Sequence, residues 1–180
     1  MIAWQPFNFE GTSYSLDHLH PRRMGFEQPA TGNAPTRQFQ VQVIFSLHCF
    51  TRNLEDGEPA PVKAMSYSDS RETRIFDFTR YELSKQLPAI VQQLQGRKCF
   101  HSGKGNYFVI ELVSDAGEQN EYEVYFDASR SSERGVINLF VQSAYIRDKA
   151  HTGNRPRKKP IKFDIILFNT LHGRPIRMPE

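Results

Sequence analysis

Four segments rich in β-branched and aromatic residues follow one another in the second half of the chain. They span residues 107–113, 122–126, 136–146 and 161–168, and each is bounded by Gly, Asn, Asp, Ser or Pro. This composition is typical of β-strands. Because consecutive strands joined by short connections pair antiparallel, the pattern predicts a mostly antiparallel sheet.

A helix is predicted over residues 79–95, just before these strands. Thr79 and Glu82 have capping-box spacing, in which a hydroxyl and a carboxylate bind the unpaired amides of the first turn. Gly96 stands where a helix commonly ends, and Pro88 interrupts the pattern, so one kinked helix or two short helices are expected. The apolar stripe consists of Tyr81, Leu83, Leu87, Ile90, Val91 and Leu94.

The first 72 residues are more varied. Residues 1–36 predict an irregular arm, with a short hairpin near Gly11 as one option. Apolar residues at odd positions from 39 to 49 predict a half-buried strand, and the Pro- and Gly-containing stretch 51–72 predicts an exposed loop.

Together these patterns predict one α+β domain over residues 1–180, with the arm over 1–36 and the core over 37–180. A mostly antiparallel sheet packs on the kinked helix or helix pair. We expect a core that includes Val41, Val43, Phe45, Leu83, Leu87, Ile90, Phe108, Ile110, Val124, Phe126, Leu139, Val141, Ile165 and Leu167.

Composition excludes several classes of protein. Fourteen Phe residues argue against wholesale disorder, because those rings need burial. Two Cys residues cannot build a disulfide framework, so a reducing cytoplasm is the expected location. The sequence lacks an apolar run near the roughly 20 residues that span a bilayer and any recognisable signal peptide, so no membrane association is expected. No cofactor is expected either.

Positive charge is concentrated late in the chain, although the formal net charge is only +3. Residues 147–160 form a cationic segment broken by Pro and Gly, which predicts a basic loop held by the sheet. A clustered cationic patch attracts polyanions through counterion release. A solvated connection is the simpler interpretation of the same residues.

The leading functional hypothesis is RNA binding with a metal-independent, toxin-like endoribonuclease activity. Tyr145, Arg147 and His151 combine a ring that can stack on a base, a cation and a titratable imidazole, which are the groups that metal-free RNA cleavage needs. They are the candidate catalytic residues. The candidate nucleic-acid-binding residues are Arg155, Arg157, Lys158, Lys159, Arg130, Arg134 and Lys104.

Two alternatives remain open. The first is a non-enzymatic module that binds a protein partner through exposed sheet edges or the arm. The second is a zinc-binding protein that uses His18, His20, Cys99 and His101, because His-x-His and Cys-x-His place both ligands on one face of a strand. Neither pair has a zinc-finger spacing, so dispersed structural roles are favoured and no metal is assigned.

The order of a helix, consecutive antiparallel strands and late cations over Thr79 to Phe168 resembles the small RelE/ParE-type toxin domains. Their RNA-cleaving members act through scattered Arg, Lys, His and Tyr residues on a sheet. The resemblance implies an α+β fold and RNA as the partner. It rests on element order, so no catalytic residue is transferred from it.

Overall fold

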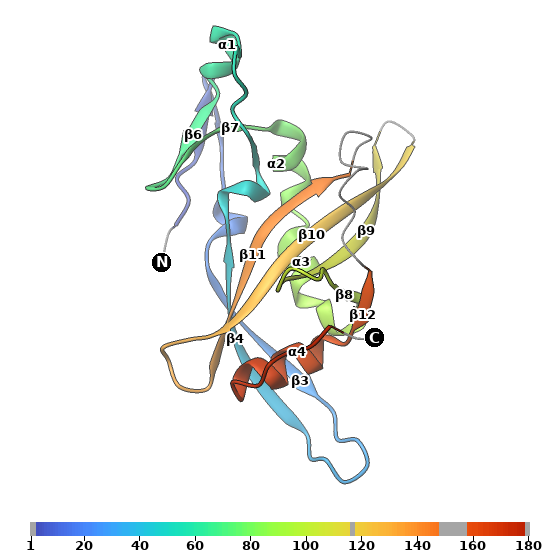
Figure 1. Cartoon of the computed structure of the whole chain (residues 1–180). Helices are drawn as coiled ribbons and strands as arrows, with labels where there is room; N and C mark the ends of the chain where they lie inside the picture. Colours follow the sequence, from blue (N-terminus) through green and yellow to red (C-terminus); the bar gives the residue numbers. More distant parts are fainter. Residues whose placement is uncertain (1–2, 116–117, 148–157, 179–180) are drawn as a thin grey trace.

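A seven-stranded, mostly antiparallel sheet forms the centre of the computed structural model, which describes residues 3–115, 118–147 and 158–178 (Figure 1). The strand order is β12-β8-β9-β10-β11-β4-β3. In chain order the strands are β3 (Arg22–Gln28), β4 (Arg37–Phe45), β8 (Cys99–His101), β9 (Tyr107–Asp115), β10 (Glu118–Arg130), β11 (Val136–Ile146) and β12 (Lys159–Ile161). The predicted fold class, α+β with a mostly antiparallel sheet, is confirmed.

One pair in this sheet is parallel. β11 runs parallel to β4, with Leu139 opposite Val43, whereas the other neighbours are antiparallel. Parallel neighbours need a long crossover connection, and residues 46–135 supply it here. The register places Val41, Val43 and Phe45 on the buried face, as their alternation predicts.

A three-stranded sheet and an N-terminal hairpin form a second, smaller part of the structure. The sheet consists of β5 (Thr51–Arg52), β7 (Thr73–Phe76) and β6 (Ser66–Ser68), in that order, and the hairpin of β1 (Phe7–Phe9) and β2 (Thr12–Tyr14). Stacked rings join the two, because the ring centroids of Phe7 and Phe76 are 4.0 Å apart. Short 3-10 turns at Asp17–Leu19 and Leu47–Cys49 and helix α1 (Ala60–Lys63) complete this region.

Pro88 divides the predicted helix into two, which confirms one of the two expected arrangements. α2 spans Phe78–Ser84, α3 spans Leu87–Gln92, and a 3-10 turn follows at Leu94–Gly96. Pro88 lies in the first turn of α3, where its missing N–H costs no helical hydrogen bond. The predicted capping box is wrong, because Asp77 is the N-cap and its side chain accepts from the backbone N–H of Arg80.

The strand predicted over residues 161–168 is also wrong. β12 ends at Ile161, and α4 spans Phe163–Leu171. Its buried residues are Phe163, Ile166, Leu167 and Thr170, which lie at helical spacing. Ile165, expected in the core, therefore faces outward and is 45% exposed. The β-branched residues favoured a strand locally, but packing on β10 and β11 selects the helix.

Several expectations for the first half of the chain need correction. The predicted irregular arm contains the edge strand β3. Its charged residues Arg22, Arg23 and Glu27 interrupt the alternation of apolar and polar residues that would predict a strand. The predicted strand over 39–49 ends at Phe45 and gives way to the 3-10 turn. The predicted loop over 51–72 contains β5, α1 and β6.

Most of the predicted core residues are buried. Leu83 and Ile110, in addition to the exposed Ile165, are the exceptions, because both are only partly buried. Across the described ranges, no helix is both long and apolar enough to cross a membrane.

The corrected helix cap gives a first prediction. Replacing Asp77 with Ala removes the acceptor for the Arg80 N–H and should lower the free energy of unfolding by about 1 kcal/mol. Urea denaturation measures this change. Thr79→Ala is the matched control and should lower the free energy of unfolding by less. Equal losses of stability in the two variants would contradict the assignment of Asp77 as the cap.

Candidate functional site

Arg147, a predicted catalytic residue, forms a buried ion pair with Glu123. The Arg147 guanidinium donates to both carboxylate oxygens, at 2.7 Å and 2.8 Å, and also to the Tyr125 hydroxyl at 3.2 Å. Tyr125 donates to the same carboxylate at 2.6 Å, and Glu123 is fully buried. Burial raises the pKa of Glu123, but the hydrogen bonds from Arg147 and Tyr125 outweigh it and leave the pKa lowered. Arg147 therefore has a structural role in the sheet.

Tyr145, the second predicted catalytic residue, belongs to a row of aromatic rings across four adjacent strands. The row runs Phe100–Phe108–Tyr125–Tyr145, with successive ring centroids 5.2, 5.1 and 5.8 Å apart. Lys98 lies over the ring at one end, and Arg80 over the ring at the other. The two inner rings are buried and the two outer rings are partly exposed, so only the ends of the row are accessible.

One end of the row opens into a groove beside α2, which we call the α2 groove. Its polar part has a volume of about 340 Å³. The lining residues come from the end of β5 and the chain after it, from α2 and its N-cap, and from the end of β11: Arg52, Asn53, Glu55, Asp77, Thr79, Arg80, Leu83, Tyr145 and Ile146.

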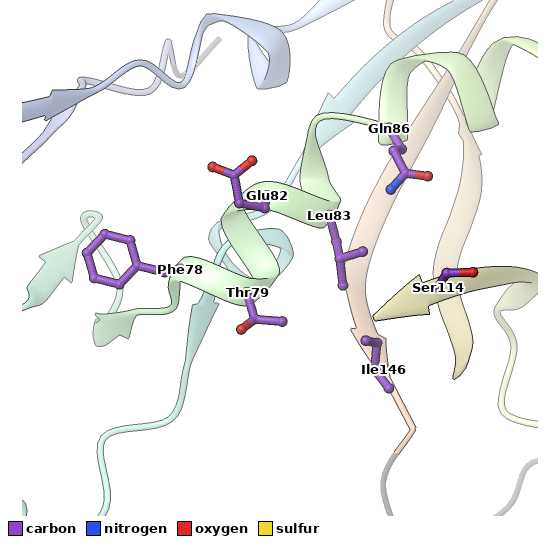
Figure 2. A pocket seen from close by; sticks show the side chains of 7 residues that line it. All are labelled: Phe78, Thr79, Glu82, Leu83, Gln86, Ser114 and Ile146. Carbon is purple, nitrogen blue, oxygen red and sulfur yellow. The ribbon is translucent and has the colours of Figure 1, made fainter. Parts of the chain in front are cut away.

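An apolar part of about 400 Å³ adjoins the polar part, because Thr79, Leu83 and Ile146 line both. Figure 2 shows Leu83 pointing from α2 toward Ile146 and Ser114 across this hollow. The groove therefore changes from polar to apolar along α2.

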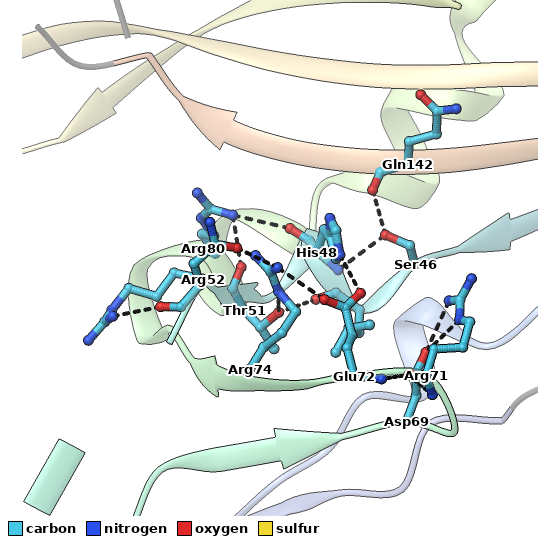
Figure 3. Close-up of polar contacts among 12 residues, drawn as sticks. Ser46, His48, Thr51, Arg52, Asp69, Arg71, Glu72, Arg74, Arg80 and Gln142 are labelled. Atoms are coloured by element: carbon cyan, nitrogen blue, oxygen red, sulfur yellow. Dashed lines mark hydrogen bonds and ion pairs between the residues drawn. The ribbon is translucent and has the colours of Figure 1, made fainter. Parts of the chain in front are cut away.

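A network of side chains holds the polar part in place (Figure 3). Glu72 accepts from His48 at 2.7 Å and from Arg74 at 3.3 Å, and Arg74 donates to the Thr51 hydroxyl at 2.9 Å. The carbonyl oxygen of Thr51 in turn accepts from Arg80 at 2.8 Å. The hydrogen bond from His48 lowers the pKa of Glu72 from its usual value, which favours the ionised carboxylate.

A second hollow, the basic hollow, lies where β12 meets the start of α4. Its volume is about 500 Å³, and its lining residues are Gln95, Arg97, Lys98, Pro160, Ile161, Lys162, Phe163 and Asp164. Arg97 is paired with Glu111 and donates to Gln93. Lys98 and Lys162 are exposed.

The other predicted nucleic-acid-binding residues are dispersed. Lys104 lies in the turn between β8 and β9, Arg130 ends β10, and Arg134 is exposed in the turn between β10 and β11. Lys158 approaches Glu121 at 3.8 Å, and Lys159 opens β12 beside the basic hollow. His151, Arg155 and Arg157 lie outside the described residues.

The four residues of the zinc alternative have separate partners. His18 shares a hydrogen bond with Ser84, and His20 with the carbonyl oxygen of Trp4. Cys99 and His101 are buried in β8, and burial raises the pKa of the Cys99 thiol to about 12. The residues that the structure describes contain no group of three or more His, Cys, Asp or Glu able to hold a metal ion.

Sequence reasoning missed Arg80, Arg52 and Lys98 as site residues. Arg80 lies in the predicted helix, whereas Arg52 and Lys98 lie in short segments without a recognisable motif. Each lines its cavity together with residues from elements distant in the sequence. Of the predicted site residues that the structure describes, Tyr145 alone lines the α2 groove.

The ion pair gives a second prediction. Arg147→Met leaves the Glu123 carboxylate buried without a cation and should cost about 3 kcal/mol of stability, measured by urea denaturation. Adding Glu123→Leu should recover much of the loss, because no unpaired charge then remains. Arg23→Met, which breaks the exposed pair with Glu133, is the control and should change little. A loss in Arg147→Met no larger than in this control would contradict the buried role.

Comparison with known proteins gives one family. Residues 6–171 match the model described as the YjaZ family. The chain is 30% identical over 179 residues to Protein YjaZ of Escherichia coli (strain K12), and the match covers 98% of this chain and 96% of that protein. No solved structure matches. The chain therefore belongs to the YjaZ family.

Proposed function

We propose that this protein binds single-stranded RNA at the basic hollow. Cations from separate segments of the chain line this one cavity, and this observation supports the proposal. Arg97 and Lys98 precede β8, whereas Lys162 precedes α4, more than 60 residues later in the sequence. A cavity bordered by cations favours a ligand with phosphate groups.

Two of these cations are available to a ligand. In the described part of the chain, the ammonium groups of Lys98 and Lys162 have no carboxylate partner, whereas Arg97 is paired with Glu111. Lys162 is also the N-cap of α4 and makes no side-chain hydrogen bond to its first turn. The start of α4 therefore adds unpaired N–H groups and a partial positive charge.

An aromatic ring next to the hollow favours a single strand over a duplex. The Lys98 ammonium lies 5.6 Å from the centroid of Phe100, whose ring is partly exposed. The bases of a single strand can stack on such a ring while its phosphates contact nearby cations. A duplex keeps its bases stacked on one another.

The proposal is limited to binding. Arg147 forms an ion pair with Glu123, so a role of Arg147 in cleavage would require that buried pair to break. Tyr145 lies at the opposite end of the aromatic row from the basic hollow. The toxin-like endoribonuclease activity remains a prediction that the following experiment also tests.

Replacing both Lys98 and Lys162 with Ala should weaken RNA binding in the same way for all sequences. If each ammonium neutralises one phosphate, the slope of log K against log salt should flatten by about 1.4. Fluorescence anisotropy with a labelled single-stranded RNA across a salt series measures this slope. The double variant Lys63→Ala and Lys85→Ala, which removes two lysines outside the hollow, is the matched control.

Two results would contradict the proposal: unchanged binding in the Lys98 and Lys162 variant, or no binding by the parent protein at low salt. The alternative of a protein-binding module would then lead. The same samples run on a gel report cleavage, and a product that His151→Ala abolishes would support the endoribonuclease prediction.

A further inference from the structure

Arg80 is a partly buried cation whose charge is incompletely balanced. Its Nη1 donates to the carbonyl oxygens of His48 at 3.4 Å and Thr51 at 2.8 Å. Its guanidinium carbon lies 5.5 Å from the ring centroid of Tyr145. Among the described residues, no carboxylate is hydrogen-bonded to this guanidinium. Burial lowers the pKa of Arg80, and the nearby charge of Asp77 only partly opposes that effect.

Three of the four acidic groups around the groove have partners. Asp77 accepts from the first turn of α2 at 2.9 Å. Glu82 accepts from Lys85, and Glu58 is paired with Arg52. Glu55 is exposed at the rim. Arg80 is therefore the lining cation that has no carboxylate partner in the described part of the chain and can pair with an incoming anion.

The remainder of the groove is lined by the apolar side chains of Phe78, Leu83 and Ile146 and by the polar side chains of Thr79, Glu82, Gln86 and Ser114, so a hydrocarbon chain fits along its apolar wall. Leu83 and Ile146 face each other across the apolar part, and Phe78 lies at its border (Figure 2). Binding cavities of this kind combine apolar walls with a few polar groups that fix orientation.

We propose that the α2 groove binds a small amphipathic anion. Its carboxylate or phosphate head pairs with Arg80, and its hydrocarbon part lies between Leu83 and Ile146. Binding here is independent of RNA binding, because the α2 groove and the basic hollow have no lining residue in common.

Isothermal titration calorimetry with octanoate and octyl phosphate tests the proposal on the full chain. 1-Octanol has the tail without the charge, and acetate has the charge without the tail. At least one of the two anionic amphiphiles should bind more tightly than both controls. The tighter of the two identifies the preferred head group.

Two variants test the two parts of the groove. Arg80→Gln should weaken binding of the anionic amphiphile about tenfold or more, because the charge-assisted contact is lost. Thr79→Trp should abolish binding by filling the groove from a position where the side chain is exposed. Thr12→Trp, on the exposed part of the N-terminal hairpin, and the Lys98 and Lys162 double variant should both leave binding unchanged.

Equal binding of 1-octanol, or no effect of either groove variant, would overturn the proposal. Failure of both anionic amphiphiles to bind the parent protein would do the same. If Arg80→Gln unfolds by circular dichroism, Thr79→Trp decides the result, because it leaves the Arg80 hydrogen bonds to His48 and Thr51 in place.

Discussion

Burial of β10 on both of its faces is the constraint on which the rest of the structure depends. Every side chain from Tyr122 to Phe126 is buried, so alternate residues need cover on opposite sides of the sheet. On one face, Phe126 contacts Phe163 of α4. On the other face, Tyr125 lies in the aromatic row, and Glu123 needs the charge of Arg147. A carboxylate at this depth is tolerated only because its partner and hydrogen bonds are supplied together.

The same arrangement places the two proposed binding surfaces apart. The aromatic row extends from Phe100 in β8 to Tyr145 in β11, with a cation over the ring at each end. Lys98 belongs to the basic hollow and Arg80 to the α2 groove. Because the two inner rings are buried, the row fixes the spacing of the two surfaces and presents only its ends to ligands.

Both surfaces lie within the part of the chain that matches the YjaZ family, which runs from residue 6 to residue 171. The similarity to the Escherichia coli protein also covers nearly the whole of both chains. Binding by the basic hollow and binding by the α2 groove are therefore two separate proposals about one member of this family, and each can fail without the other.

Local patterns in the sequence determined the sheet class and much of its core. Two strands could be predicted from neighbouring residues alone: the strand with alternating apolar residues around Val41 and Val43, and the β-rich run at 136–146. A strand with one buried face has a period of two in its own sequence. The division of the helix at Pro88 follows in the same way from the lost N–H and the steric clash of one residue.

Only the tertiary structure decided which residues meet. The segment 161–168 has strand-forming residues, yet packing on β10 and β11 selects a helix for most of it. Arg147 was predicted to be a catalytic cation, but its charge pairs with the buried Glu123 of another strand. Arg80 lies over the ring of Tyr145, although the two residues are 65 positions apart in the sequence, and no local pattern predicts this contact. Long-range packing and the pairing of buried charges act between segments, so a sequence read segment by segment predicts only part of the secondary structure and none of the sites.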